Sequence, residues 1–255
     1  MSTPEELARQ IFSERAAFYT TSASHKDPET LSKLVALAQP QPHWLALDVA
    51  TGTGHTAFAL APYLQHVTGT DLTPAMLDEA RKLQAELGIT NVDFRVADVH
   101  DLPFPAANFD LVCSRRAAHH FSDIQRALHE MARVLKPGGR LAIDDRSVPE
   151  DDFVDRTMNL LDTYHDASHV RQYRPSEWRR VLTAEGLTVE AVELLPRRRP
   201  LTSLTHNAEP ADVKRIHDVI VSLNDEQRRA MNVATKNGEW YLNHWFVLVA
   251  AAKPA

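Results

Sequence analysis

The sequence predicts an α/β protein in which a doubly wound, mostly parallel sheet carries helices on both faces. Short apolar runs alternate with segments of helical spacing, and a glycine turn follows the first run. Strands that alternate with helices pair in parallel, because each crossover helix returns the chain to the same end of the sheet. The seven predicted strands lie at residues 44–47, 66–70, 92–96, 109–113, 140–144, 187–195 and 240–252.

Apolar spacing and helix-terminating residues predict the helices between these strands. Pro74 stands at the first turn of one helix and Gly88 ends it. The run Pro137-Gly138-Gly139 is expected to stop another helix at Val134. Helices are predicted at residues 5–18, 31–38, 56–64, 74–87, 123–134, 149–164, 176–184 and 211–223.

Composition is that of an ordinary globular chain: 255 residues, 44% hydrophobic and 24% charged. The net charge of -6 argues against a nucleic-acid partner, and we expect the basic run 197–199 to lie on a solvated loop. A single cysteine, Cys113, excludes an internal disulfide, and we predict no metal site. No apolar run reaches the length of a membrane span, and the first residues do not resemble a signal peptide. The expected location is therefore the cytoplasm.

The glycine turn after the first strand indicates a nucleotide-like cofactor. Gly52 and Gly54 let the backbone pass close to a ligand, and the helix that follows offers free amides. Asp71 follows the second strand, where a carboxylate can accept hydrogen bonds from a ribose diol. The turn also fits the G-x-G-x-x-A pattern of dinucleotide folds, and a plain tight turn is the alternative. Asp48, Asp71, Asp98 and the stretch after Cys113 all fall at carboxyl ends of strands, where such sheets bind ligands.

Five segments in this order resemble the class I S-adenosylmethionine-dependent methyltransferases, in the small-molecule branch related to ubiquinone and menaquinone biosynthesis enzymes. They are LDVATGTG at 47–54, TGTDLTPAMLDEAR at 68–81, VADVHDLPFPAANFDLV at 96–112, RRAAHHFSD at 115–123 and ARVLKPGGRLAIDD at 132–145. YTTSASH at 19–25, GHTAFALAP at 54–62 and DASHVRQYRPSEW at 166–178 look like an uncharacterised subgroup of that branch.

The resemblance implies a single domain, 1–255, with a Rossmann-like methyltransferase fold. Its expected parts are an N-terminal helical lid (1–40), a cofactor-binding half (41–145), a helical cap inserted after strand 5 (146–186) and C-terminal strands and helices (187–255). Ala50 stands where the family has its first glycine, and alanine is small enough for S-adenosylmethionine binding to be kept.

The resemblance also implies cofactor contacts. Asp48 would orient the turn and reach the methionine amino group, while Gly52 and Gly54 would face the methionine and ribose. Asp71 would bind the ribose hydroxyls. The remaining implied contacts are Leu72 on the adenine, Asp98 and Val99 at the adenine amino group, a backbone carbonyl of Ser114 or Arg115, and Tyr19 closing from the lid. Plainer alternatives are an Asp48 satisfied by the turn's own amides, a helix-start role for Asp71 and simple packing of Tyr19.

Histidines supply the candidate acid–base groups on the acceptor side. His119 and His120 follow the fourth strand, where family members meet the acceptor; one of the two would face the site, or both would cap a helix. Arg115 and Arg116 would bind an acidic acceptor or pair with carboxylates. In the cap, His165, His169, Arg171 and Tyr173 would roof the acceptor pocket, or make local loop contacts. The candidate catalytic residues are His119, His120, His169 and Tyr173.

We therefore expect methyl transfer from S-adenosylmethionine to an oxygen, nitrogen or ring carbon of a small-molecule acceptor. Positioning supplies much of the acceleration of such an in-line displacement. The rival hypotheses are a nicotinamide-dependent oxidoreductase that uses the same glycine turn, and a non-catalytic S-adenosylmethionine-binding protein. We expect a monomer or a homodimer.

Overall fold

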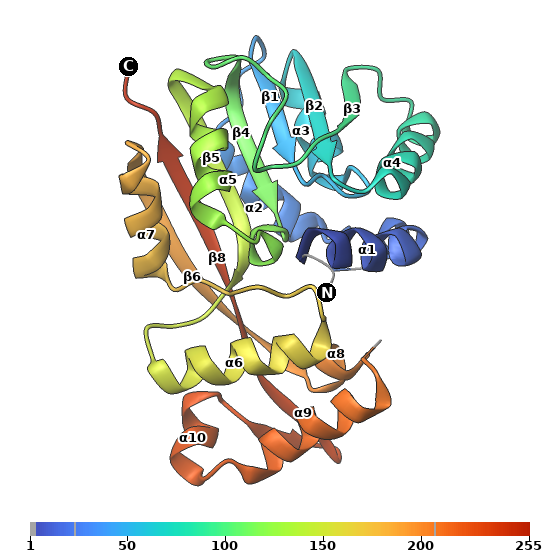
Figure 1. Cartoon of the computed structure of the whole chain (residues 1–255), viewed down its shortest axis with the longest axis vertical. Coiled ribbons are helices and arrows are strands. Elements are labelled where there is room, and N and C mark those ends of the chain that lie inside the picture. Colours follow the sequence, from blue (N-terminus) through green and yellow to red (C-terminus); the bar gives the residue numbers. More distant parts are fainter. Residues whose placement is uncertain (1–3, 23, 207) are drawn as a thin grey trace.

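A computed structural model describes residues 4–22, 24–206 and 208–255. Among these residues one sheet of eight strands forms the centre, in the order β3-β2-β1-β4-β5-β8-β6, with β7 paired to β8 (Figure 1). The strands are β1 Leu45–Val49, β2 His66–Asp71, β3 Val92–Val96, β4 Phe109–Arg115, β5 Leu135–Ser147, β6 Thr188–Pro200, β7 Ala234–Lys236 and β8 Glu239–Ala252. The first five strands are parallel, and β8 runs antiparallel to β5, β6 and β7. The mostly parallel sheet is confirmed, but the count of seven strands was wrong, because it missed the three-residue β7.

Helices cover both faces of the sheet. They are α1 Pro4–Thr21, α2 Pro28–Ala38, α3 His55–Leu60, α4 Pro74–Leu87, α5 Ile124–Val134, α6 Asp152–His165, α7 Pro175–Ala184, α8 Thr202–Thr205, α9 Pro210–Ser222 and α10 Asp225–Ala230. Short 3-10 turns lie at Ala61–Tyr63 and Ala118–His120. No helix of the described part of the chain is both long and apolar enough to cross a bilayer.

Side-chain alternation along the strands divides the core into two faces. Leu47 on β1 belongs to the core under α5 and α7, whereas its neighbour Ala46 belongs to the core under α2, α3 and α4. Trp178 of α7 is completely buried in the first of these cores. Leu34 and Ala38 bury α2 in the second core, so of the two predicted lid helices only α1 lies across the strand ends (Figure 1).

A third core forms beyond the strand ends. The long strands β6 and β8 extend past the other strands, and α6, α8, α9 and α10 pack beside this extension (Figure 1). Met158 of α6, Ile216 of α9 and Trp245 of β8 are buried together there. This layer places α6 and the loop after it next to the carboxyl ends of the central strands.

Two sequence expectations need correction. The run Pro137-Gly138-Gly139 does not separate a helix from a later strand, because β5 already begins at Leu135, which pairs with Phe109 of β4. Gly138 donates a backbone hydrogen bond to Lys253 at 2.9 Å, so contacts distant in sequence hold this segment extended. The basic run 197–199 is not a solvated loop but part of β6, with Arg197 and Arg199 half-buried.

Candidate functional site

A first cavity opens at the carboxyl ends of β1, β2, β3 and β4, beneath α1. It is lined by most of the residues predicted to bind a cofactor: Tyr19, Ala50, Gly52, Asp71, Leu72, Asp98, Val99 and Arg115. Parallel strands end at the same edge of the sheet, which is why residues far apart in sequence meet there. The lining residues do not include Asp48, Gly54 or Ser114.

The glycine turn has a left-handed backbone at three positions. Ala50 has φ +54°, Gly52 φ +54° and Gly54 φ +87°. The left-handed region favours glycine, so Ala50 adopts a costly conformation at the position where glycine is expected. A Cβ on Gly52 would meet no protein atom within 4 Å, whereas a Cβ on Gly54 would lie 2.7 Å from the ring of Phe58. Gly52 therefore keeps the cavity open to a ligand, and Gly54 permits close packing of α3.

Asp71 joins the end of β2 to the glycine turn. Its Oδ2 accepts a hydrogen bond from the Gly52 amide at 2.9 Å, and its Oδ1 accepts one from the Thr73 amide at 2.8 Å. Each carboxylate oxygen has a further lone pair, so Asp71 can support the turn and the start of α4 while accepting from a ligand. Asp98 is arranged similarly, since its Oδ1 accepts from the backbone amide of His100 at 2.9 Å.

Asp48 and Ser114 lie behind the turn rather than in the cavity wall. Asp48 is buried and accepts from Thr51 Oγ1 at 2.6 Å and Cys113 Sγ at 3.5 Å. Burial raises the pKa of Asp48 to about 6. The hydroxyl of Ser114 is buried and has no hydrogen-bond partner among the described residues. These two partners of Asp48 are thus a hydroxyl of the turn and a thiol of the neighbouring strand β4, whereas the plainer alternative expected backbone amides of the turn.

Arg115 and Tyr19 connect the N-terminal segment to the strand ends. Arg115 donates from Nε to Thr56 Oγ1 at 2.9 Å and from Nη2 to the His25 carbonyl at 2.7 Å. The ring of Tyr19 lies 4.7 Å from that of His25 and 5.8 Å from that of Phe12, centre to centre. Burial raises the pKa of Tyr19 to about 12, so its phenol stays neutral.

A second cavity, of about 490 Å³, adjoins the first between α1, the loop after α6 and the extended strands. The two cavities share five lining residues: Phe12, Tyr19, His25, Arg116 and His120. A ligand in the first cavity and a second molecule in the adjoining one would thus meet at a common wall.

His119 and His120 both line the second cavity. The expectation that only one of two adjacent residues faces the site was wrong, because the 3-10 turn Ala118–His120 brings the two rings together, with centres 4.0 Å apart and planes tilted by 43°. His119 Nδ1 lies 2.6 Å from Asp145 Oδ1, and its backbone amide donates to Asp145 Oδ2 at 2.9 Å. Burial lowers the pKa of His119 well below its usual value, so the imidazole is neutral at pH 7. Asp145, whose pKa burial raises to about 6, is then still ionised.

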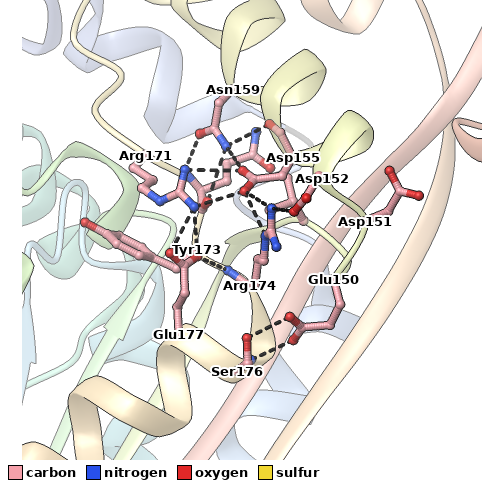
Figure 2. Close-up of polar contacts among 12 residues, drawn as sticks. Glu150, Asp151, Asp152, Asp155, Asn159, Arg171, Tyr173, Arg174, Ser176 and Glu177 are labelled. Atoms are coloured by element: carbon pink, nitrogen blue, oxygen red, sulfur yellow. Dashed lines mark hydrogen bonds and ion pairs between the residues drawn. The ribbon is translucent and has the colours of Figure 1, made fainter. Parts of the chain in front are cut away.

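The cap residues separate into two groups. His165 and His169 line the second cavity, but Arg171 and Tyr173 line neither cavity. Arg171 forms ion pairs with Asp155 at 3.1 Å and Glu177 at 2.9 Å, and Figure 2 shows Arg171 and Arg174 converging on Asp155. The ring of Tyr173 packs edge-on against Trp178, 5.6 Å between centres. Tyr173 is therefore removed from the candidate catalytic residues, since its surroundings are those of a packing residue.

The sequence did not predict three contacts of the site region. Asp145 pairs with His119, Asn159 of α6 contacts His169, and Arg199 of β6 lines the second cavity. No local motif marks these contacts, which join segments distant in the chain. Among the described residues no group of three or more histidine, cysteine or acidic side chains is arranged to hold a metal ion.

Comparison with known proteins extends these observations. Residues 47–143 match the model of a methyltransferase domain. A Bacillus subtilis protein described as the uncharacterized methyltransferase YcgJ is 37% identical over 182 residues, which cover 71% of this chain and 72% of that protein. Its crystal structure has a TM-score of 0.84 at 32% identity and covers 89% of this chain and 99% of that one. A demethylmenaquinone methyltransferase of Clavibacter sepedonicus is 39% identical over 114 residues, 45% of this chain and 46% of that enzyme.

Proposed function

Because the chain belongs to the S-adenosylmethionine-dependent methyltransferases, we propose that it methylates a small molecule held in the second cavity. One observation carries this proposal: two cavities with a shared wall lie at the strand ends, and His119, whose Nδ1 contacts Asp145, lines only the second. The attacking atom is an oxygen, a nitrogen or a ring carbon. The family membership argues against the nicotinamide-dependent rival.

The first cavity fits S-adenosylmethionine. Gly52 leaves space that a Cβ would fill, and Asp71 presents carboxylate oxygens beside it. Asp71 would bind the ribose hydroxyls, Leu72 would pack on the adenine, and Asp98 would accept from its amino group. Asp48, behind the turn, would act by holding the turn in shape. When bound, S-adenosylmethionine supplies a methyl group attached to positively charged sulfur, which makes the carbon electrophilic.

His119 is the candidate general base for an acceptor that must lose a proton. Asp145 engages Nδ1, which leaves Nε2 as the nitrogen that can take a proton. The Asp145 carboxylate would compensate the positive charge that then forms on the buried ring. His120 and His169, which line the same cavity, would orient the acceptor through hydrogen bonds.

Ligand binding tests the cofactor assignment. S-adenosylhomocysteine should raise the melting temperature of the protein, because a ligand that binds only the folded state stabilises it. NADH should not. A shift with NADH and none with S-adenosylhomocysteine would exclude the proposed cofactor.

Methyl transfer tests the acceptor side. The protein is incubated with methyl-labelled S-adenosylmethionine and a small-molecule extract of cells, and label in a new compound identifies an acceptor. His119→Gln and Asp145→Asn should lower turnover, by about 10²–10⁴-fold for His119 if proton removal contributes to the chemical step. The control His129→Gln changes an exposed histidine of α5. Tight S-adenosylhomocysteine binding without any labelled product would favour the non-catalytic alternative. The oligomeric state and the cytoplasmic location stay predictions.

A further inference from the structure

Three arginines surround one aromatic ring in the wall of the second cavity. The guanidinium of Arg116 lies 3.9 Å from the ring centre of Phe246, that of Arg199 lies 5.6 Å away and that of Arg197 lies 5.9 Å away. The register of β6 with β8 explains the grouping. Leu195 is opposite Phe246, so the alternation of side chains brings Arg197 and Arg199 to the same face as that ring. Arg198 alternates to the other face and is exposed.

The arginines of this region differ in their carboxylate partners. Arg116 pairs with Asp144 at 3.3 Å, and Arg197 pairs with Asp27 at 3.6 Å. Arg146, which also lines the cavity, pairs with Asp162 at 2.7 Å. Arg199 has no ion pair or hydrogen bond to any residue that the structure describes, although it is half-buried and lines the cavity.

Arg199 therefore differs from Arg116 and Arg146, whose charges are each compensated by a carboxylate. The cavity lining contains two carboxylates, Asp162 and Asp166. Asp162 is engaged by Arg146, and Asp166 accepts from Ser168 Oγ at 2.6 Å. Partial removal from water, with Arg116, Arg146 and Arg197 nearby, lowers the pKa of Arg199. Like charges repel strongly where water is scarce, so a bound anion would stabilise the charged guanidinium of Arg199 by offsetting this repulsion.

We propose that the acceptor carries an anionic oxygen group, a carboxylate or a phosphate, that binds to Arg199 and Arg116 beside Phe246. This inference rests on the proposed function, since it assigns a chemical class to the acceptor of that reaction. Guanidinium groups present paired N–H donors that match the oxygens of both anions. Arg116 lines both cavities, so an anion bound there anchors the acceptor next to the wall that it shares with the cofactor site.

The test uses the full chain saturated with S-adenosylhomocysteine and two probes, inorganic pyrophosphate and benzoate. Each probe is titrated calorimetrically at constant ionic strength in sodium chloride. We expect saturable binding of at least one probe, and the probe that binds more tightly distinguishes a phosphate from a carboxylate acceptor. Arg199→Gln should weaken that binding about tenfold, the effect of losing a hydrogen bond to a charged group. The matched control Arg198→Gln, one residue away on the exposed face, should change it less than about twofold.

The outcomes separate this inference from the proposed function. If S-adenosylhomocysteine binds but neither probe does, or if Arg199→Gln and Arg198→Gln bind the probes equally, the anion site is refuted and the cofactor assignment stands. If S-adenosylhomocysteine does not bind the unmodified protein, the proposed function itself fails. Unchanged S-adenosylhomocysteine affinity in Arg199→Gln verifies that this variant is folded.

Discussion

Asn159 fixes the tautomer of His169. The Oδ1 atom of Asn159 accepts a hydrogen bond from the Gln172 amide at 2.7 Å and lies 3.0 Å from His169 Nε2. Its Nδ2 donates to Asp155 Oδ1 at 2.7 Å, so the amide orientation is determined by its neighbours. Because Oδ1 can only accept, Nε2 of His169 carries the proton. Nδ1 is then a lone-pair acceptor, and it is buried without a partner among the described residues.

The first prediction concerns pH and stability. Burial lowers the pKa of His169 to about 2. The unfolded chain takes up a proton at this histidine below about pH 6.5 and the folded chain does not, so stability falls as pH falls. Between about pH 7.5 and about pH 5.5, His169 should account for a loss of about 1 kcal/mol. Urea unfolding of His169→Gln at both pH values should show a smaller loss than the unmodified protein. His217→Gln, on the exposed side of α9, is the control. If His169→Gln loses as much stability between the two pH values as the unmodified protein, His169 is not held neutral in the folded state.

The second prediction concerns Asp71. Asp71→Asn removes the charge and leaves one oxygen where two now accept from backbone amides. Hydrogen bonds to charged groups contribute about 1.5–3 kcal/mol, so S-adenosylhomocysteine affinity should fall about 10- to 100-fold. Calorimetry measures this. Asp78→Asn, an exposed change on α4, should leave affinity unchanged, and a folded Asp71→Asn protein with full affinity would exclude Asp71 from the site.

The third prediction compares three glycines with positive φ. Gly186→Ala places a Cβ in open space away from both cavities, so it measures the backbone cost alone, about 1–2 kcal/mol. Gly52→Ala should cost the same stability and also weaken S-adenosylhomocysteine binding about tenfold or more, because its Cβ enters the cavity. Gly54→Ala should destabilise the fold most, since its Cβ would overlap Phe58. Thermal unfolding measures the stability effects and calorimetry measures the binding effects. Equal S-adenosylhomocysteine affinity in Gly52→Ala and Gly186→Ala would contradict the placement of the ligand beside Gly52.

The fourth prediction concerns the ion-pair cluster of the cap. The carboxylate of Asp155 is 7% exposed and pairs with Arg171 and Arg174. Asp155→Asn should destabilise the protein by about 2–3 kcal/mol, because two partly buried guanidinium groups lose the buried carboxylate that they share and keep only the more exposed Glu177 and Asp152. Asp152→Asn changes the 72% exposed partner of the same Arg174 and should cost less than about 1 kcal/mol. Both variants should bind S-adenosylhomocysteine normally, and similar unfolding free energies for the two would show that Asp155 does not stabilise the cap.

Local sequence signals predicted the regular elements best. The helix Pro74–Leu87 and the strand Val92–Val96 have the bounds that their apolar spacing and flanking residues predicted. The start of β5 was missed because its proline and glycines are locally unfavourable, and only pairing with Phe109 and Lys253 makes the segment extended. The short α8, α10 and β7 carry too few residues for periodicity to be read.

The two cavities differ in how far the sequence predicted them. Strand ends of a parallel sheet converge by topology, so the order of strands and helices along the chain was enough to group Gly52, Asp71 and Asp98. The second cavity depends on the register of antiparallel strands and on the path of a loop. Arg199 faces it only because β6 pairs with β8 with Leu195 opposite Phe246. Neither apolar spacing nor a motif encodes that register.

The walls of the two cavities come in part from different stretches of sequence. Every residue that lines the first cavity falls between Glu5 and Phe121, whereas the second cavity takes many of its walls from between Arg146 and Phe246. Exchanging the C-terminal part would thus change those walls of the second cavity, while Arg116, His119 and the whole lining of the first cavity stay in the N-terminal part. Because β8 lies between β5 and β6 in the sheet, the exchanged segment must include β6, β8 and the helices between them. Such an exchange would comprise residues 146–252, and its junction with the N-terminal part would lie inside β5.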